Sequence, residues 1–310
     1  MSTLGPLHLF EGYGIEIEFA LVDRDTLEPL PIAHLVLADA AGAPVADHDD
    51  GDIGWSNELV DHQLEFKCQR PSPDLAALEV AFGESLDRAD VVAHARKARL
   101  LPAGMHPWLK PGRLTKLWPG EGHEVYAALD ALYNCRRHGY ANVHSTHLNL
   151  PFATDAEFGA LLAAVRFLLP VMPALAASSP VCEGRVTGLL DTRLDHYRKN
   201  GGRTPTIVGT VVPEPVYDVA GYHARVLAPI YAEIAPLDTK GVLGTHEWQN
   251  ARGAIARFDR GAIEIRVLDS QEHVPADLAL CGLISHALRG LVEGRHGDPR
   301  AHAAFPQAAL

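Results

Sequence analysis

The segment GIEIEFALVD, close to the N-terminus, limits the folds open to this chain more than any other stretch. Ile15, Ile17 and Phe19 alternate with Glu16 and Glu18, so a strand here has one apolar face and one face with two carboxylates. The two carboxylates repel each other unless a positive charge lies between them. The segment therefore predicts a half-buried strand whose acidic face holds a cation.

Two later segments repeat this pattern. Glu58 and Glu65 lie in ELVDHQLEFK, residues 58–67, which predicts a second strand. Glu264 and Arg266 lie in AIEIRVLDS, where isoleucine and valine occupy the alternate positions. A single strand of this kind is also typical of an antiparallel sheet with one solvated face. Glutamates with apolar neighbours in three predicted strands favour a shared acidic site instead.

Strands and helices alternate irregularly along the chain, and several neighbours are spaced like hairpins. We predict strands at 13–22, 58–67, 141–151, 254–258 and 262–268, and helices at 73–98, 121–137, 155–176 with Asp155 as N-cap, 219–235 and 275–293. This order is typical of an α+β fold in which helices back a curved, mainly antiparallel sheet. We expect a single catalytic domain over residues 1–310 that ends in a loose tail over 294–310.

Composition excludes several classes of partner. The chain has 27 Lys+Arg against 39 Asp+Glu, and its net charge of −12 repels the phosphates of nucleic acids. No segment has the roughly 18 apolar residues of a membrane helix, and Met1 to Leu9 lacks a signal-peptide pattern. We therefore expect a cytoplasmic protein. The 4 cysteines are far apart without a CxxC pair, so we expect packed thiols.

Clustered carboxylates without cysteine ligands suit hard divalent cations. Mg²⁺ or Mn²⁺ commonly bridges protein carboxylates to phosphate oxygens. His147 in THLNLP is a candidate nitrogen ligand, and Asn149 shares its face of the predicted strand. His144 lies on the opposite face, so we expect it to be structural.

Arginine is the second recurring residue. Arg185 and Arg193 lie in a loop-like stretch in the middle of the chain, and Arg252, Arg257 and Arg266 lie near the last two strands. Guanidinium groups bind phosphate and carboxylate oxygens through paired hydrogen bonds and stabilise charge on a transferring phosphoryl group. Each arginine alone is more often a surface ion pair. The sequence has neither a P-loop nor a GxGxxG motif, so it predicts another kind of phosphate site.

Four segments together carry a family resemblance. GIEIEFALVDRDTLEPLP, ELVDHQLEFK, THLNLP and AIEIRVLDSQ resemble the signature blocks of the carboxylate-amine ligases related to glutamate–cysteine ligase type 2, in the glutamine synthetase superfamily. The blocks follow the family's order over residues 12–275. Ser145 stands where relatives often have a second histidine. The resemblance implies a fold like the glutamine synthetase catalytic domain, with two or three divalent ions held by Glu16, Glu18, Glu58, Glu65, His147 and Glu264.

The resemblance also implies roles for the arginines. Arg252 and Arg257 are similar to a pair that meets substrate carboxylate and phosphates, and Arg266 to a strand arginine beside the transferred phosphoryl group. SSPVCEGRVTGLLDTR resembles a loop that ends in an arginine, here Arg193. We assign cofactor contacts to Arg185, Arg193 and Asn149.

The implied activity is an ATP-dependent ligation. A carboxylate, here expected to be the side chain of glutamate, is activated as an acyl phosphate with release of ADP, and an amine then displaces phosphate to form the amide. A phosphotransferase on the same scaffold is one alternative, and a module that binds nucleotide and metal without turnover is another. We expect small-molecule partners, with a homodimer as the default assembly.

Overall fold

A computed structural model of the chain describes residues 5–112 and 114–310, so residues 1–4 of the N-terminal stretch lie outside the described residues. An eight-stranded sheet forms its centre, in the order β2–β3–β4–β1–β6–β10–β9 with β5 paired to β1. All pairings given within this sheet are antiparallel, as the sequence predicts. The strands are β1 (Gly14–Asp23), β2 (Asp47–Asp50), β3 (Ile53–Asn57), β4 (Gln63–Cys68), β5 (Ala98–Leu101), β6 (Ser145–Pro151), β9 (Ala254–Arg257) and β10 (Ala262–Asp269).

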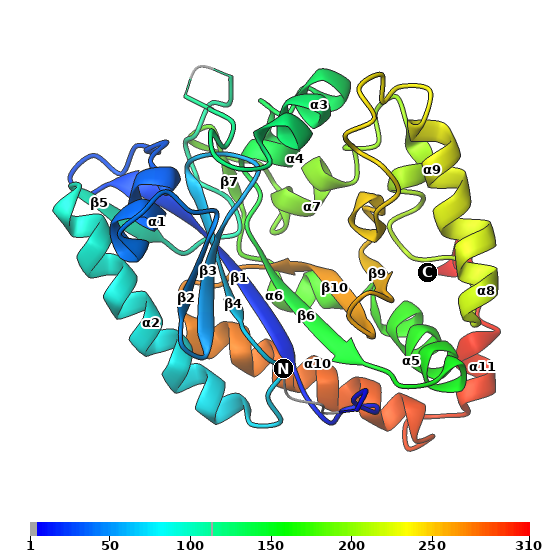
Figure 1. Ribbon diagram of the computed structural model, residues 1–310. Coiled ribbons are helices and arrows are strands. Elements are labelled where there is room, and N and C mark those ends of the chain that lie inside the picture. The colour runs from blue at the N-terminus through cyan, green and yellow to red at the C-terminus, as the bar shows by residue number, and fades with distance from the viewer. Residues whose placement is uncertain (1–4, 113) are drawn as a thin grey trace.

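The apolar face of the sheet lies against the hydrophobic core. Ile15, Ile17 and Phe19 of β1 are buried there, together with Leu148 of β6 and Ile263 of β10. In Figure 1, helices α2 (Leu75–Ala95) and α10 (Val274–Val292) lie together along this side of the sheet. The alternation of apolar residues in the strands thus produces one covered face, and the glutamates are left on the other.

Other helices lie on both sides of the sheet and near the chain ends. Figure 1 shows α3 and α4 at one end and α9 at the edge near β9. The remaining helices are α1 (Ala33–Ala41), α3 (His123–Tyr133), α4 (His138–Ala141), α5 (Asp155–Leu168), α6 (Met172–Ala176), α7 (Thr192–Tyr197), α8 (Val219–Tyr222), α9 (Ala228–Ile234) and α11 (Pro299–Ala303). A separate two-stranded hairpin consists of β7 (Val181–Cys182) and β8 (Arg185–Val186).

The strand predicted at 58–67 is shorter than expected and starts at Gln63. Val60 makes an isolated bridge to Leu117, and the Asp61 amide donates to the Lys116 carbonyl oxygen, which takes the preceding residues out of the ladder. Glu58 therefore belongs to the loop before β4. The prediction that a strand carries Glu58 was wrong.

Proline and left-handed residues divide the predicted helices. The helix expected at 155–176 breaks into α5 and α6 at Pro170, which has no amide hydrogen to donate. Thr154, and not Asp155, is its N-cap, since the Thr154 side chain accepts from the Glu157 amide. The helix expected at 121–137 ends as α3 at Tyr133, because Asn134 takes a left-handed conformation (φ 52°).

The C-terminal segment, residues 294–310, is mostly exposed, but part of it makes defined contacts. It contains α11, and His302 is buried with its ring stacked on Phe167 at 4.5 Å between centroids. The Tyr217 hydroxyl donates to the Ala303 carbonyl oxygen at 2.7 Å. These contacts hold the end of the chain against α5.

Two expectations from composition can be compared with the described residues. The 4 cysteines are free thiols, in agreement with the spacing argument. Within residues 5–112 and 114–310, no helix combines the length and the apolar composition required to cross a bilayer.

Candidate functional site

Strand register places the acidic side chains next to one another. Glu18 of β1 is paired with Glu65 of β4, and Glu16 is paired with His147 of β6. On the other side of β6, Asn149 is paired with Glu264 of β10. Directly paired residues of antiparallel strands have side chains about 5 Å apart on the same face. The sheet therefore gathers carboxylates from three strands around His147.

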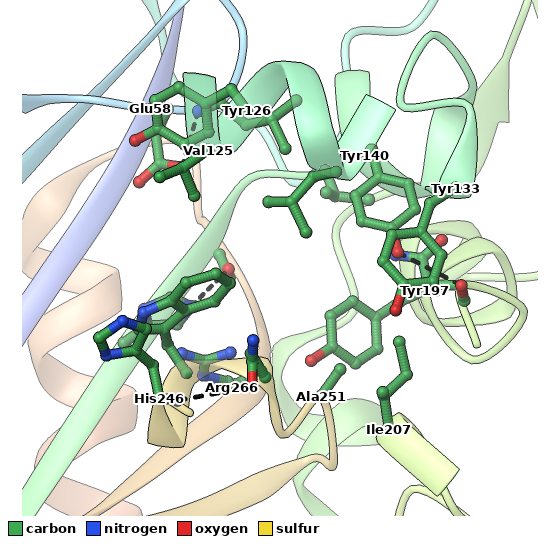
Figure 2. Close-up of a pocket in the computed structure, with 18 of the residues that line it drawn as sticks. Glu58, Val125, Tyr126, Tyr133, Tyr140, Tyr197, Ile207, His246, Ala251 and Arg266 are labelled. Atoms are coloured by element: carbon green, nitrogen blue, oxygen red, sulfur yellow. Dashed lines mark hydrogen bonds between the residues drawn. The ribbon is translucent and has the colours of Figure 1, made fainter. Parts of the chain in front are cut away.

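These side chains line a cavity of about 630 Å³ on the acidic side of the sheet. All six residues predicted as metal ligands border it. Figure 2 shows Glu58 near Tyr126 at one end, with Arg266 and His246 across the cavity from Tyr133 and Tyr140. The cavity thus has an acidic floor and partly aromatic walls.

Two sets of potential metal ligands overlap at Glu65. Ligand atoms of Glu16, Glu65 and His147 lie within 4.8 Å of one another, and so do those of Glu18, Glu58 and Glu65. A shared carboxylate lets two cations lie side by side. Glu264 belongs to neither set, although its Oε1 atom lies 4.0 Å from His147 Nδ1.

The charges of these carboxylates strain the metal-free site. Burial, and then the nearby charge of Glu18, raise the pKa of Glu58 to about 8. Burial together with Glu16 and Glu58 likewise raises the pKa of Glu65 well above its ordinary value. Burial alone would also raise the pKa of Glu16, but hydrogen bonding to His147 and the charge of Arg260 outweigh it and hold that pKa low. Lys67, whose Nζ atom lies 3.7 Å from Glu65 Oε2 and also pairs with Asp47, does not offset these effects.

The donor set fits a hard divalent cation. It offers carboxylate oxygens and one imidazole, which are ligands that suit Mg²⁺ and Mn²⁺. The buried Oδ1 atom of Asn149 has no hydrogen-bond partner among the described residues, so a further oxygen is free close to Glu16. Neutralisation by a cation also removes the repulsion that raises the pKa values of Glu58 and Glu65.

Hydrogen bonds from neighbouring residues orient the carboxylates. Ser56 Oγ donates to Glu65 Oε2 at 2.8 Å. The backbone amide and hydroxyl of Ser145 both donate to Glu18 Oε2, at 2.6 and 3.1 Å. Ser145 therefore positions a candidate metal ligand. Such outer contacts fix the direction of the lone pairs offered to a metal.

Three predicted arginines reach the cavity. Arg266 pairs with Glu264 through Nε, and Arg257 donates to Glu264 at 2.9 Å and to Asp259. Arg193, which is buried, donates to Asp269 Oδ1 at 2.6 Å and also lines the cavity. β10 has a register shift next to Arg266, a bulge of the kind that redirects a side chain at a site.

Arg252 and Arg185 are placed elsewhere. Arg252 donates from two nitrogens to Glu214, each at 2.7 Å, and from a third to the Thr206 carbonyl oxygen, and it does not line the cavity. Arg252 lies at a bend before β9 (Ala254–Arg257), so the strand alternation that directs Arg257 does not apply to it. Arg185 is exposed on β8. Asn149 lies beneath the cavity and donates to Glu16 at 3.3 Å.

Several residues of the cavity were not predicted from the sequence. Arg260 lies in the turn between β9 and β10 and reaches Glu16 at 2.7 Å. Tyr133 and Tyr140 come from separate helices and stack at 5.8 Å. The buried Tyr197 side chain lies beside Arg266 and lines the cavity. No motif marks these residues, because each reaches the cavity from a loop or short helix.

Comparison with known proteins identifies the family of this chain. The sequence model of "Glutamate-cysteine ligase family 2(GCS2)" matches residues 13–309. The chain belongs to glutamate–cysteine ligase family 2. All the candidate metal ligands lie within the matched residues.

Relatives of this family member differ in distance. An uncharacterized protein of Archaeoglobus fulgidus is 36% identical over 281 residues, which are 90% of this chain and 74% of the relative. A protein of Haloquadratum walsbyi named glutamate–cysteine ligase is 25% identical over 295 residues, 92% of this chain and 71% of that protein.

Among solved structures, a bifunctional glutathione synthetase from Pasteurella multocida aligns with a TM-score of 0.55 at 13% identity. The alignment covers 97% of this chain and 40% of that one. At this identity the likeness shows a shared fold.

Proposed function

We propose that this protein is an ATP-dependent carboxylate-amine ligase that forms an amide, with the side-chain carboxylate of glutamate as the acid. One observation carries the proposal: the metal-ligand set and the guanidinium groups of Arg193, Arg257 and Arg266 line one cavity. A carboxylate resists attack by an amine because it is anionic and lacks a good leaving group. Activation by phosphoryl transfer removes both obstacles. Family membership supports the same activity.

Glu16, Glu18, Glu58, Glu65, His147 and Glu264 would hold Mg²⁺ or Mn²⁺. When bound, the ions screen the charge of the triphosphate. The chain's own task is positioning. Ser145 and Ser56 fix the carboxylates, and Glu264 holds the guanidinium of Arg266 over the cavity.

The proposed reaction has two steps. A carboxylate oxygen of the acid attacks the γ-phosphorus of ATP, the bond to the β-phosphate oxygen breaks, and ADP leaves. The amine nitrogen then attacks the acyl carbon, loses a proton, and the acyl–oxygen bond breaks to release inorganic phosphate. Arg266 and Arg193 line the cavity, and their guanidinium groups would stabilise charge on the transferring group. No nucleophilic side chain is required.

The test incubates the protein with ATP, Mg²⁺ and glutamate that carries ¹⁸O in its side-chain carboxylate, together with a panel of amines. We expect an amide by mass spectrometry, ADP and phosphate in equal amounts, and ¹⁸O in the phosphate. AMP and pyrophosphate would reject the acyl-phosphate route. Phosphorylation of an acceptor without amide would indicate a phosphotransferase, and binding without turnover would indicate a silent module.

A further inference from the structure

The turn between β9 and β10 places Arg260 on the metal-ligand set. Its Nη1 atom lies 2.7 Å from Glu16 Oε1, and Glu16 belongs to the set formed with Glu65 and His147. We propose that Arg260 is an exchangeable counter-ion, which neutralises Glu16 in the metal-free protein and turns to the nucleotide polyphosphate once a divalent cation binds Glu16. The second half of this proposal rests on the proposed use of ATP; the first half does not.

Exposure separates Arg260 from the other arginines of the cavity. The side chains of Arg257 and Arg266 are 10% and 17% exposed, and both pair with the buried Glu264. The Arg260 side chain is 45% exposed, and Glu16 is its ion-pair partner. The Glu16 side chain is only 12% exposed, so water competes for the guanidinium end of this pair and little for the carboxylate. Arg260 is therefore free to exchange partners, whereas Arg257 and Arg266 are fixed.

Glu16 keeps other contacts when Arg260 leaves. His147 Nδ1 and Asn149 Nδ2 each lie 3.3 Å from its carboxylate. A divalent cation brings twice the charge of a guanidinium to the same oxygen and is shared with Glu65. We therefore expect the cation to win the competition for Glu16.

The released guanidinium needs a new anion. Asp259, its sequence neighbour, already accepts hydrogen bonds from Nε and Nη2 of Arg257, at 3.0 and 2.9 Å. Arg260 lines the cavity that would hold the triphosphate, and a planar guanidinium matches phosphate oxygens with two parallel donors. A polyphosphate is thus the acceptor whose chemistry fits.

The turn itself does not require the Arg260 side chain. Backbone bonds from the Arg260 amide to the Arg257 carbonyl oxygen at 3.1 Å and from Gly261 to Phe258 at 3.3 Å close it. Gly261 has φ 63°, a left-handed conformation that glycine adopts without strain. Substitution of Arg260 should therefore leave the hairpin intact.

The experiment measures binding rather than turnover. Calorimetry gives the affinity for Mn²⁺ without nucleotide, and then for ATP at saturating Mg²⁺, in the parent, Arg260→Ala and Arg260→Lys. Arg24→Ala is the matched control, because Arg24 is 50% exposed and pairs with Asp25 at another turn. We expect Arg260→Ala to bind Mn²⁺ about twofold to fivefold more tightly and ATP about tenfold more weakly. Arg260→Lys should keep the parent's Mn²⁺ affinity and lose part of its ATP affinity, and the control should match the parent.

Unchanged or weaker Mn²⁺ binding by Arg260→Ala would overturn the exchange, as would unchanged ATP binding. Because neither titration needs an amide product, a parent that binds Mn²⁺ and ATP but forms no amide would refute the ligase and still test Arg260. A parent that binds no Mn²⁺ would overturn both.

Discussion

β1 presents Ile15 and Ile17 to one side of the sheet and Glu16 and Glu18 to the other, and the two sides differ in what holds them together. The apolar side packs against α2 and α10 with its side chains buried. The acidic side gathers mutually repelling carboxylates, of which Glu58 has its pKa raised to about 8, first by burial. The apolar face therefore stabilises the fold. The carboxylates of the acidic face repel one another and lower the stability, but together they form a candidate cation site.

The largest expected effect comes from the apolar face. Ile17→Ala removes a fully buried side chain and should lower the free energy of unfolding by about 2–5 kcal/mol. Denaturant titration measures it, with Val91→Ala as control, because Val91 is exposed on α2. Metal affinity of the folded fraction should stay close to that of the parent. A large loss of metal affinity at full folding would mean that the two faces are not separable.

The matching change on the acidic face should act on activity alone. Glu65→Gln keeps the shape but removes the charge shared by both ligand sets, so kcat/KM for amide formation should fall at least about 100-fold. The melting temperature of the metal-free protein should stay equal or rise, because a repelling charge is lost. Glu79→Gln, on the exposed face of α2, is the control. Retained turnover would mean that the acidic face is only a wet sheet surface.

A substitution at Arg266 tests whether turnover needs the planar guanidinium or only a positive charge. Arg266→Lys keeps one positive charge beside Glu264 but loses the planar fork. We expect kcat to fall about 100-fold, as for the loss of one preorganised donor, with little change in KM for ATP. Arg198→Lys, an exposed arginine paired with Asp195, is the control. A kcat within a few-fold of the parent would make Arg266 a structural partner of Glu264.

The alternation of residues in strands predicted the acidic face and much of its membership. Register between strands follows from the same alternation, so Glu16, Glu18, Glu65 and Glu264 could be assigned to one face from sequence. Glu58 also lies at the site, but it arrives from a loop that the pattern read as strand.

Side chains on turns and short helices follow no such period. The sequence predicted that Arg252 and Arg257 act as a pair at the site, but Arg252 precedes β9 and donates to Glu214. Arg260 and Tyr197 line the cavity from a hairpin turn and a short helix, where tertiary packing decides direction. The single-domain extent over 1–310, the homodimer and the cytoplasmic location stay predictions.

A rise in pH should change the stability of the metal-free protein through the carboxylates of the acidic face. The Glu58 pKa is about 8 in the folded protein against an ordinary 4.5, so the folded state binds the extra proton between these values. Metal-free stability should therefore fall as pH rises from 6.5 to 8, on the order of 1–2 kcal/mol. Below pH 6.5 the buried His62, whose pKa burial lowers to about 4, acts in the opposite direction.

Thermal unfolding of the metal-free protein across pH 6.5 to 8 measures this slope. Glu58→Gln should make the slope less steep, with the raised pKa of Glu65 accounting for the remainder, and saturating Mn²⁺ should reverse it, since the cation favours the ionised carboxylate. An equal slope in Glu58→Gln would assign the titration to another group.

The smallest expected effect concerns Arg185, which the sequence analysis assigns to cofactor contact and which the structure places on the exposed hairpin of β7 and β8. An exposed side chain away from the cavity contributes little, so Arg185→Ala should change the free energy of unfolding by less than about 0.5 kcal/mol and kcat/KM for ATP by less than about twofold. Arg193→Lys is the informative comparison, because Arg193 follows in the same stretch but is buried against Asp269 and lines the cavity. Steady-state kinetics at varied ATP, with calorimetric unfolding of the same samples, measure both. A tenfold loss for Arg185→Ala at unchanged stability would show that the hairpin closes over the bound nucleotide, and the acidic face would then have a mobile cover that the apolar face lacks.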